Sequence, residues 1–260
     1  MNYYLKNLGK YKEYIFYAAR ARLRSEVANS YLNWIWWILE PLFDMVVYII
    51  VFGYFFKVRE EYFAIFLYIG ISMWSFFSKS VIGSVGLVKR NRDIITKIYI
   101  PKSVLLLKDL LVNLFKMLLS FIVIGVMMLF YGVRLQARFI FVIPLFLTLL
   151  LFTYGISCFL LHLGVYYEDL EYFVAVLLNI WMYFSGLFYS IERLLPGVAG
   201  QLLLTVNPMA FLINSMRNAL VYGKSISVGW YFLWLLISGL LSVCGIVLIR
   251  RNENSYVKLR

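Results

Sequence analysis

The sequence predicts an all-α polytopic membrane protein with six transmembrane helices, and two observations support this fold class. The 260 residues are 63% hydrophobic, with a mean hydropathy of +0.82, whereas a soluble domain is about half apolar. The apolar residues also gather in stretches near the length of about 20 residues that a helix needs to cross a bilayer. We therefore expect one transmembrane domain over residues 1–260, with lipid as its solvent.

The six predicted spans follow a more polar first segment. They cover residues 34–56, 62–86, 104–131, 138–161, 173–190 and 228–249. In residues 1–33, Tyr4, Leu8, Tyr11 and Ile15 repeat at helical spacing among basic side chains, which predicts an amphipathic helix lying in the headgroup plane. This helix either anchors the topology or offers a docking surface, and the sequence does not separate the two.

The segment 191–227 is apolar but broken, because Pro196, Gly197, Gly200 and Pro208 interrupt it. We expect re-entrant or interfacial helices here, on the outer side, rather than a seventh span. With six spans and the N-terminus inside, the inner segments hold sixteen Lys and Arg residues and the outer segments hold seven. Cytoplasmic segments carry such an excess, so both termini, including the tail 250–260, are expected on the cytoplasmic side of the cytoplasmic membrane.

The connection between the second and third spans, GLVKRNRDIITKIYIPKS at residues 86–103, is longer than a turn requires. Ile94, Ile95, Ile98 and Tyr99 would share one face of a helix over residues 89–99. Basic side chains cover much of the remaining surface, and the following proline ends the helix. The pattern indicates either a basic loop that sets the topology or a short amphipathic helix on which another protein docks.

Four stretches occur in an order and spacing that resemble a known family. RLRSEVANSYLNWIWWILEPLFDMVVYIIVFGYFF joins the end of the basic first helix to a Trp-rich span that holds a proline. KRNRDIITKIYIPKSVLLL follows the second span, YYEDLEYFVAVLLNIWMYFSGLFYS covers the fourth loop and fifth span, and NPMAFLINSMRNALVYGKS precedes the last span. With six spans, the chain is similar over nearly its whole length to the permease subunit of type-2 ABC exporters, in the branch that exports polysaccharides and polyol phosphates.

The resemblance implies a homodimer that pairs with two copies of a separate ATP-binding subunit. ATP and Mg would bind in that partner, so no cofactor is expected in this chain. ATP binding and hydrolysis would open a channel between the protomers. The exported cargo would be a lipid-linked glycan or polyol-phosphate polymer of the O-antigen, capsule or teichoic acid type.

The resemblance also assigns the contact with the ATP-binding subunit. The helix at 89–99 would be a coupling helix, and the acidic turn Tyr167–Glu171 would be a second, shorter contact. The candidate coupling residues are Arg92, Asp93, Ile94, Ile95, Lys97, Ile98, Glu168 and Asp169. Family members usually carry a basic residue before the aspartate of this turn, whereas this chain has Glu168.

The sequence offers no enzymatic or metal site. The nearest approach to a P-loop, NALVYGKS at 218–225, has Asn218 where the first glycine is required. His162 is the one histidine, and the acidic cluster Glu168, Asp169 and Glu171 lacks metal-ligand spacing. The net charge of +12 is explained by the topology, so no nucleic-acid partner is expected.

Four charged residues lie inside the predicted spans: Glu40, Asp44, Lys79 and Lys116. Ionised groups at the bilayer centre are costly unless they are paired or hydrated. We expect Asp44, and with it Glu40, either to pair with Lys79 or Lys116 or to face a water-filled conduit. Glu40 could also lie near the inner interface.

Aromatic residues make up 19% of the chain, and interfacial belts and packing account for most of them. Flat aromatic faces bind sugar rings loosely, as a sliding polymer requires, so a minority could line an export path. The first candidates are Tyr183, Phe184, Phe188 and Tyr189, and the second are Trp74, Phe76 and Phe77.

Two other function classes stay open at this point. A secondary transporter or channel driven by an ion gradient would favour internal repeats and paired ion ligands at the membrane centre. The sequence shows no convincing repeat and only Asp44 with its neighbours. A membrane-embedded enzyme such as a glycosyltransferase would need a carboxylate or histidine cluster in an aqueous loop.

Overall fold

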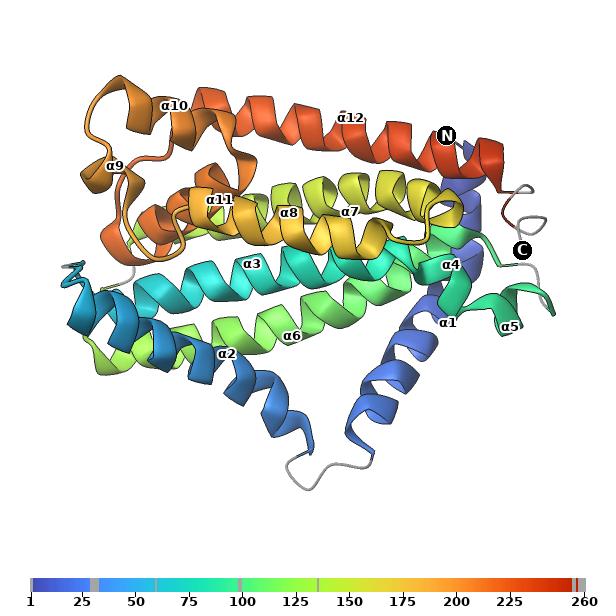
Figure 1. Cartoon of the computed structure of the whole chain (residues 1–260), viewed down its shortest axis with the longest axis horizontal. Helices are drawn as coiled ribbons and strands as arrows, with labels where there is room; N and C mark the ends of the chain where they lie inside the picture. Colours follow the sequence, from blue (N-terminus) through green and yellow to red (C-terminus); the bar gives the residue numbers. More distant parts are fainter. Residues whose placement is uncertain are drawn as a thin grey trace.

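Long helices lying side by side along one axis build the structure (Figure 1). The computed structural model describes residues 2–28, 33–58, 60–97, 100–134, 136–253 and 256. This part of the chain consists of helices and their connections, with no strand in it. The all-α fold class predicted from the sequence is therefore confirmed.

Five helical segments in the described part of the chain are long and apolar enough to cross a membrane. They are Trp36–Phe55, Phe63–Val85 (α3), Lys102–Phe130 (α6), Ala137–Tyr166 and Val228–Asn252 (α12). The 3₁₀ turn η1 (Asn33–Ile35) leads into the first segment, which joins α2 (Trp36–Tyr48) to the π-helical turns η2 (Ile49–Phe55). The fourth segment joins the 3₁₀ turn η3 (Ala137–Phe141) to α7 (Val142–Tyr166). These segments correspond to the predicted spans one to four and six.

The helix in the predicted fifth span, 173–190, begins earlier and ends earlier than predicted. The corresponding helix α8 covers Leu170–Phe184, and its 15 residues rise by about 22 Å, less than the roughly 30 Å of a hydrocarbon core. Gly186, at φ 66°, turns the chain after the helix, and Leu187 and Phe188 beside it are buried. Irregular backbone is tolerated at membrane depth where protein covers it, so α8 and this buried turn together account for the fifth span.

The broken segment before the last span forms three short helices and a π-helical turn. They are α9 (Ile191–Leu194), α10 (Val198–Val206), α11 (Pro208–Arg217) and η4 (Asn218–Tyr222). The chain bends by 101° between α10 and the segment Pro208–Tyr222. Figure 1 places the start of α9 and the start of α12 at the same end of the bundle, as expected for a re-entrant segment.

Asn207 explains the bend between α10 and α11. Its side-chain oxygen accepts the backbone N–H groups of Met209 and Ala210, at 3.1 and 3.2 Å, and Pro208 takes the first helical position. The Asn207 amide donates to the carbonyl oxygen of Phe184 at 3.0 Å. One side chain therefore begins α11 and holds it against the end of α8.

The first helix, α1 (Asn2–Val27), runs across one end of the bundle rather than along it (Figure 1). It ends before the predicted residue 33, and residues 29–32 lie outside the described part of the chain. Arg22 contacts Asp109 of α6 at 2.7 Å, and Glu26 contacts Lys116 of α6 at 2.6 Å. These ion pairs join the predicted interfacial helix to the third span.

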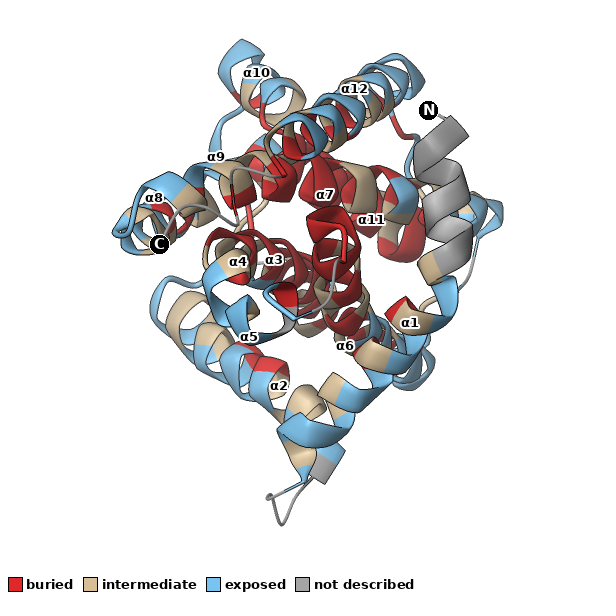
Figure 2. Ribbon diagram, turned by 90° about the vertical axis from the view of Figure 1, so that its right-hand side faces the viewer, coloured by how far each residue is buried: buried red, intermediate tan, exposed pale blue. Residues whose placement is uncertain are grey.

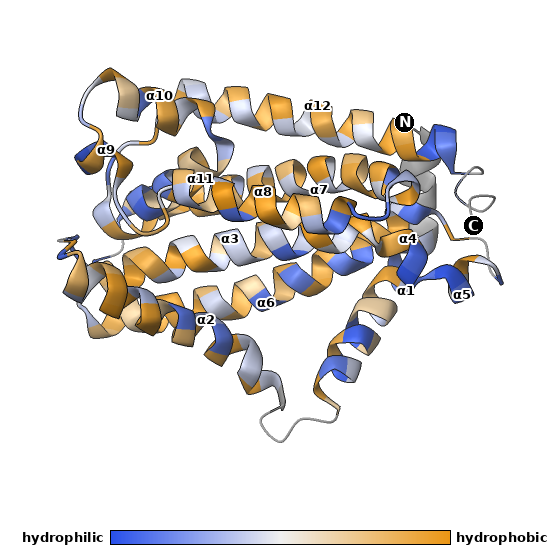
Figure 3. Ribbon diagram, in the orientation of Figure 1, coloured by the Kyte–Doolittle hydropathy of each residue, from blue (hydrophilic) through white to orange (hydrophobic). Residues whose placement is uncertain are grey.

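The two ends of the bundle carry different elements and different charge. One end, which we call the basic end, holds α4 (Leu87–Arg90), α5 (Arg92–Ile95) and the last turn of α12 (Figure 1). Figure 3 shows hydrophilic residues concentrated on these elements. The opposite end holds α9 and α10. The short polar connections thus lie at the ends, and the apolar helices lie between them.

The core of the bundle is centred on α3 (Figure 2). In the most apolar stretch of α3, 78% of the residues are buried, whereas in Trp36–Phe55 the share is 6%. A membrane-spanning helix with so little buried surface must face lipid or another chain along most of its length. The first span is therefore peripheral within this single chain.

Candidate functional site

Two single turns, α4 and α5, stand where one continuous helix over residues 89–99 was predicted, so that prediction is wrong. The turns are separated at Asn91, whose backbone leaves the helical region at φ −107° and ψ 18°. The Asn91 side-chain amide donates to the carbonyl oxygen of Leu87 at 2.8 Å. In α5, the Thr96 hydroxyl donates to the carbonyl oxygen of Arg92 at 2.9 Å. The connection therefore forms two separate turns rather than one continuous helix.

The two turns have an apolar inner side and a charged outer side. Leu87 and Ile95 are 0% and 9% exposed, so they pack on the chain's own core. Arg92, Asp93 and Lys97 are exposed. The predicted apolar docking surface therefore fails at Ile95, which is not available to a partner. The side chain of Ile94 and all of Ile98 lie outside the described residues.

The acidic turn before α8 lies directly beside α4. Lys89 Nζ lies 3.2 Å from a carboxylate oxygen of Glu168, and the Arg90 guanidinium lies 3.7 Å from that of Glu171. The two segments assigned to a partner from the sequence therefore form one continuous surface. We call it the docking face and define it by its exposed charged residues: Arg92, Asp93, Lys97, Glu168 and Asp169.

The docking face is joined to the helices behind it by close packing more than by its ion pairs. Exposed ion pairs such as these contribute only about 0–1 kcal/mol each. The carbonyl oxygen of Val85, at the end of α3, occupies the place that a Cβ on Gly164 of α7 would take. Arg90 also donates a hydrogen bond to the carbonyl oxygen of Gly83 in α3. Arg90 therefore connects α4 to α3 through its hydrogen bond to Gly83 and, more weakly, to α8 through Glu171.

The end of α12 supports the start of α6, next to the docking face in the chain. A carboxylate oxygen of Glu253 accepts the backbone N–H of Lys102 at 2.9 Å and lies 3.9 Å from its Nζ. An acidic group at a helix N-terminus is favourable because it meets free N–H groups and the positive end of the helix dipole. Sequence reasoning missed Glu253, and it named Glu171 in the acidic turn without linking it to Arg90, because nothing local in the sequence links residues so far apart.

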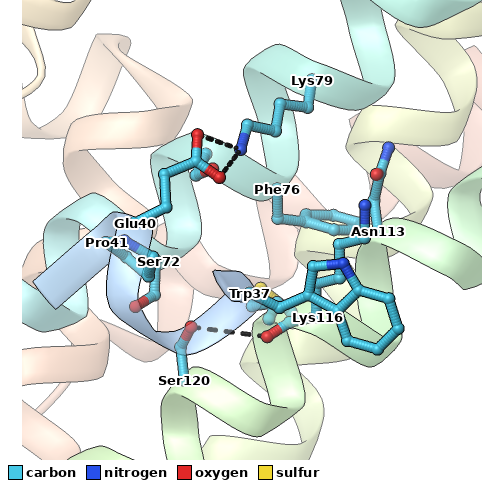
Figure 4. Close-up of a pocket in the computed structure, with 11 residues that line it drawn as sticks. Trp37, Glu40, Pro41, Ser72, Phe76, Lys79, Asn113, Lys116 and Ser120 are labelled. Carbon is cyan, nitrogen blue, oxygen red and sulfur yellow. Dashed lines mark hydrogen bonds and ion pairs between the residues drawn. The ribbon is translucent and has the colours of Figure 1, made fainter. Parts of the chain in front are cut away.

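Of the two alternatives predicted for the intramembrane carboxylates, the structure shows pairing for Glu40 but not for Asp44, for which a water-filled conduit stays a prediction. Figure 4 shows Glu40 and Lys79 pointing toward each other, and Lys79 Nζ lies 2.9 Å from both Glu40 oxygens. Lys116 instead pairs with Glu26 of α1. Asp44 is exposed and forms no ion pair within the described part of the chain.

The position of Lys79 places the Glu40 pair near the basic end. Lys79 is six residues from the last residue of α3, which corresponds to a rise of about 9 Å. The side chains of Lys79 and Glu40 are 48% and 58% exposed. The pair therefore lies closer to an interface than to the bilayer centre, where an ion pair would be most costly.

The aromatic candidates divide into buried and exposed sets. Trp74 and Phe77 are 6% and 0% exposed and pack on Trp181, with the Phe77 and Trp181 ring centroids 5.4 Å apart. Phe188 is equally buried and stacks on Phe52 with centroids 4.5 Å apart. Phe76 is buried as well. This packing inside one chain argues against a channel-lining role for Trp74, Phe77 and Phe188, whereas Phe76 lines the small cavity beside Glu40 and Lys79 (Figure 4).

Tyr183 and Phe184, at the end of α8, are the exposed candidates. Their exposed fractions are 56% and 55%, so both rings remain available to a second chain or a passing polymer. Tyr189 is partly buried, and its hydroxyl donates to the carbonyl oxygen of Tyr183. The structure therefore leaves one aromatic surface from the original set, on the same helix that begins beside the docking face.

Arg217 was assigned to an outer segment from the sequence, but the structure buries it at 2% exposed. Its guanidinium donates to the carbonyl oxygens of Phe66, Gly186 and Leu187 at 3.0, 2.7 and 2.9 Å. It also lies over the Phe66 ring, 3.3 Å from the centroid. Arg217 thus fastens α11 to the start of α3 and to the turn after α8.

A polar cleft opens at the opposite end, between the start of α3 and the re-entrant segment. Glu60, Arg134, Arg193 and Lys224 are among the residues that line it. Arg193 lies 3.2 Å from Glu60, whose side chain is 5% exposed. Burial raises the pKa of the Glu60 carboxyl, while Arg193 acts in the opposite direction. The opposite end therefore has its own charged surface, distinct from the docking face.

Comparison with known proteins agrees with this arrangement. Residues 17–221 match the family described as ABC-2 type transporter. The chain is 26% identical over 213 residues to the O-antigen export system permease protein RfbA of Myxococcus xanthus, covering 82% of each chain. It is 26% identical over 218 residues to a protein of the same name from Klebsiella pneumoniae, covering 84% of this chain and 83% of that one. The family match extends over more than half of the chain and includes the docking face, so this multi-pass membrane protein belongs to the ABC-2 type transporter family.

Proposed function

We propose that the chain is the channel-forming permease subunit of an ABC exporter. A separate subunit would bind ATP with Mg, and its ATP binding and hydrolysis would drive the export. The observation that carries this proposal is the docking face, which collects two distant segments into one charged surface at the basic end. The family membership and the O-antigen export permeases among its relatives support the same function.

The cargo would be a lipid-linked polysaccharide or polyol-phosphate polymer, crossing the cytoplasmic membrane. The basic end would face the cytoplasm, because Lys and Arg residues concentrate on the cytoplasmic side of membrane proteins. Both termini would then be cytoplasmic, and α9 and α10 would face outward. This orientation places the docking face where an ATP-binding subunit can reach it.

A homodimer with two ATP-binding subunits would complete the exporter. The apolar first span, with 6% of its residues buried, offers surface to a second copy as well as to lipid. Tyr183 and Phe184 of α8 are exposed and could line a path between two copies. Aromatic faces would contact successive sugar rings without holding any one of them.

The contacts behind the docking face suggest how a push from the partner reaches this path. Arg90 links α4 to Gly83 of α3 and to Glu171 in the first turn of α8. A displacement of α4 would therefore move the base of α8, whose far end carries Tyr183 and Phe184. The partner's closure on ATP would in this way widen the gap between the two copies of α8.

The test is a charge reversal on the docking face that leaves the chain's own packing intact. Asp93→Lys changes an exposed carboxylate, and the permease is co-purified with its co-expressed ATP-binding subunit. Because misplaced charge at an interface costs several kcal/mol, we expect co-purification and polymer export to fall about ten-fold or more. Glu61→Lys, an equally exposed carboxylate at the opposite end, is the matched control and should change neither. Full export by Asp93→Lys, or equal loss in the control, would contradict the proposed docking role.

A further inference from the structure

An apolar groove of about 600 Å³ runs between α6 and α12, with α7 as its floor. Leucines at 107, 110, 111 and 114 form its α6 wall, one helical face at i, i+3, i+4 and i+7. Val243, Ile246 and Val247 belong to its α12 wall, and Tyr154 lies on the floor. At the end of the groove nearest the basic end, the lining changes from aliphatic residues to the charged side chain of Arg250.

The groove exists because both wall helices rest on α7 at different places. Gly155 of α7 and Gly245 of α12 let these helices approach so closely that an added Cβ would overlap the other helix. Ser242 of α12 donates to the carbonyl oxygen of Leu151 at 2.7 Å along the same contact. On the far half of α6, Phe121 packs on Phe146 of α7 with centroids 4.7 Å apart. Nearer the basic end the two walls stand apart around the groove, and they meet again beyond Arg250, where Glu253 accepts the backbone N–H of Lys102.

Gly239 marks the other limit of the groove. A Cβ built on it would meet no atom within 4 Å, so the groove is open at this position. From Gly239 to Arg250 the helix advances eleven residues, about 16 Å. This is close to half of the roughly 30 Å hydrocarbon thickness. The groove therefore has the depth of one leaflet, with its apolar limit near the bilayer centre.

The positive charge of Arg250 distinguishes among lipids whose acyl chains fit the groove. Arg250 lines the groove at the basic end, and Arg251 follows it on α12. Basic pockets between transmembrane helices on the cytoplasmic side bind anionic headgroups. A zwitterionic headgroup also offers a phosphate, but its cationic group is repelled by the guanidinium, so an anionic headgroup is favoured. A phospholipid whose acyl chain lies in the groove would have its phosphate at the level of Arg250.

We propose that this groove binds one acyl chain of an anionic phospholipid from the leaflet at the basic end, with the headgroup phosphate at Arg250. The site is separate from the docking face and from the exposed aromatic surface of α8. Only the identification of that leaflet as the cytoplasmic one rests on the proposed function.

The experiment measures retained lipid by native mass spectrometry on the purified full-length chain. The chain is equilibrated with equal amounts of phosphatidylglycerol and phosphatidylcholine of identical acyl composition. We expect one phosphatidylglycerol per chain to be retained in preference to phosphatidylcholine. Gly239→Leu narrows the groove at its limit near the bilayer centre and should lower retention, whereas Gly229→Leu places the same side chain in equally open space near the opposite end and should not.

The charge requirement is tested with a second matched pair. Arg250→Gln should lower the preference for phosphatidylglycerol about five-fold, the effect of one basic residue near the membrane surface. Arg251→Gln, which removes an arginine that does not line the groove, should leave the preference unchanged. Equal retention of both lipids by the natural chain, or undiminished retention by Gly239→Leu, would overturn the proposal. Displacement of phosphatidylglycerol by an equimolar polyprenyl phosphate would also overturn it, because the groove would then belong to an isoprenoid lipid. None of these measurements depends on export.

Discussion

At the scale of single residues, Arg217 and Glu60 show that two buried charged side chains are stabilised in different ways. Arg217 is enclosed and satisfied by three carbonyl oxygens. Glu60 is nearly enclosed but has an exposed partner, Arg193, on one side. Removing a buried charged donor such as Arg217 leaves several acceptors without partners. A buried carboxylate such as Glu60 can instead become neutral by binding a proton.

Replacing Arg217 should destabilise the chain strongly. Arg217→Met keeps much of the side-chain volume but leaves the carbonyl oxygens of Gly186 and Leu187 without their donor, which should cost about 3 kcal/mol. Arg217→Lys should restore only part of this, because an ammonium cannot reproduce the planar fork of donors. Thermal unfolding of the detergent-purified chain, followed by tryptophan fluorescence, measures both. Arg134→Met, at an exposed arginine of the opposite end, is the control, and an equal loss there would refute the special role of Arg217.

The raised pKa of Glu60 predicts a pH dependence of stability. Burial raises the pKa of this carboxyl above its ordinary value of 4.5, with Arg193 opposing. The folded chain then binds more protons than the unfolded chain just above that value, so the contribution of Glu60 to stability falls as pH rises through the folded pKa. Glu60→Gln should remove this fall. Unfolding midpoints of both chains from pH 4 to pH 8 measure it, and parallel curves would show that Glu60 does not titrate in this way.

At the scale of elements, the connection between α3 and α6 shows what periodicity can and cannot predict. The spacing of apolar residues located an amphipathic segment correctly, but it assigned Ile95 to an outward face that the structure buries. Periodicity finds a face without saying whether the chain's own core or a partner covers it. It also missed the break at Asn91, because periodicity records the spacing of apolar residues and not the backbone angles of the polar residue between them.

The contact between the ends of α3 and α7 should be intolerant of any side chain at Gly164. Gly164→Ala forces a Cβ into the carbonyl oxygen of Val85, and overpacking of this kind costs about 1–3 kcal/mol. We expect a lower unfolding midpoint and weaker binding of the ATP-binding subunit, since the docking face rests on this contact. Gly125→Ala in α6 meets no atom within 4 Å and is the control. Equal behaviour of the two variants would show that the α3 to α7 contact is not tight.

At the scale of the whole molecule, the asymmetry between the two ends predicts the orientation in the membrane. Lys97 lies at the basic end and Glu61 at the opposite end, and both are exposed. In a background with Cys158→Ala and Cys244→Ser, a membrane-impermeant thiol reagent should label Glu61→Cys in intact cells and leave Lys97→Cys unlabelled. Both should react once the membrane is opened. Labelling of Lys97→Cys in intact cells would place the docking face outside and contradict the proposed function.

Much of this architecture can be predicted from the sequence, because lipid imposes its requirements locally. A helix must be apolar over about 20 consecutive residues to cross, so the first, second, third and sixth spans lie within three residues of their predicted bounds. The fourth span begins as predicted but continues to Tyr166 instead of residue 161. The broken segment 191–227 was also predicted, because proline and glycine disrupt helices wherever they stand. The distribution of Lys and Arg along the chain likewise separates the two ends.

Contacts between distant segments settle what hydropathy and spacing leave open. The core position of α3, the burial of Arg217 and Trp74, and the support of α6 by Glu253 each depend on residues far apart in the chain. The shortened α8 depends on a turn that the rest of the bundle covers. Hydropathy measures how unfavourable it is to expose a residue to water. It does not show whether lipid, the same chain or another protein covers that residue.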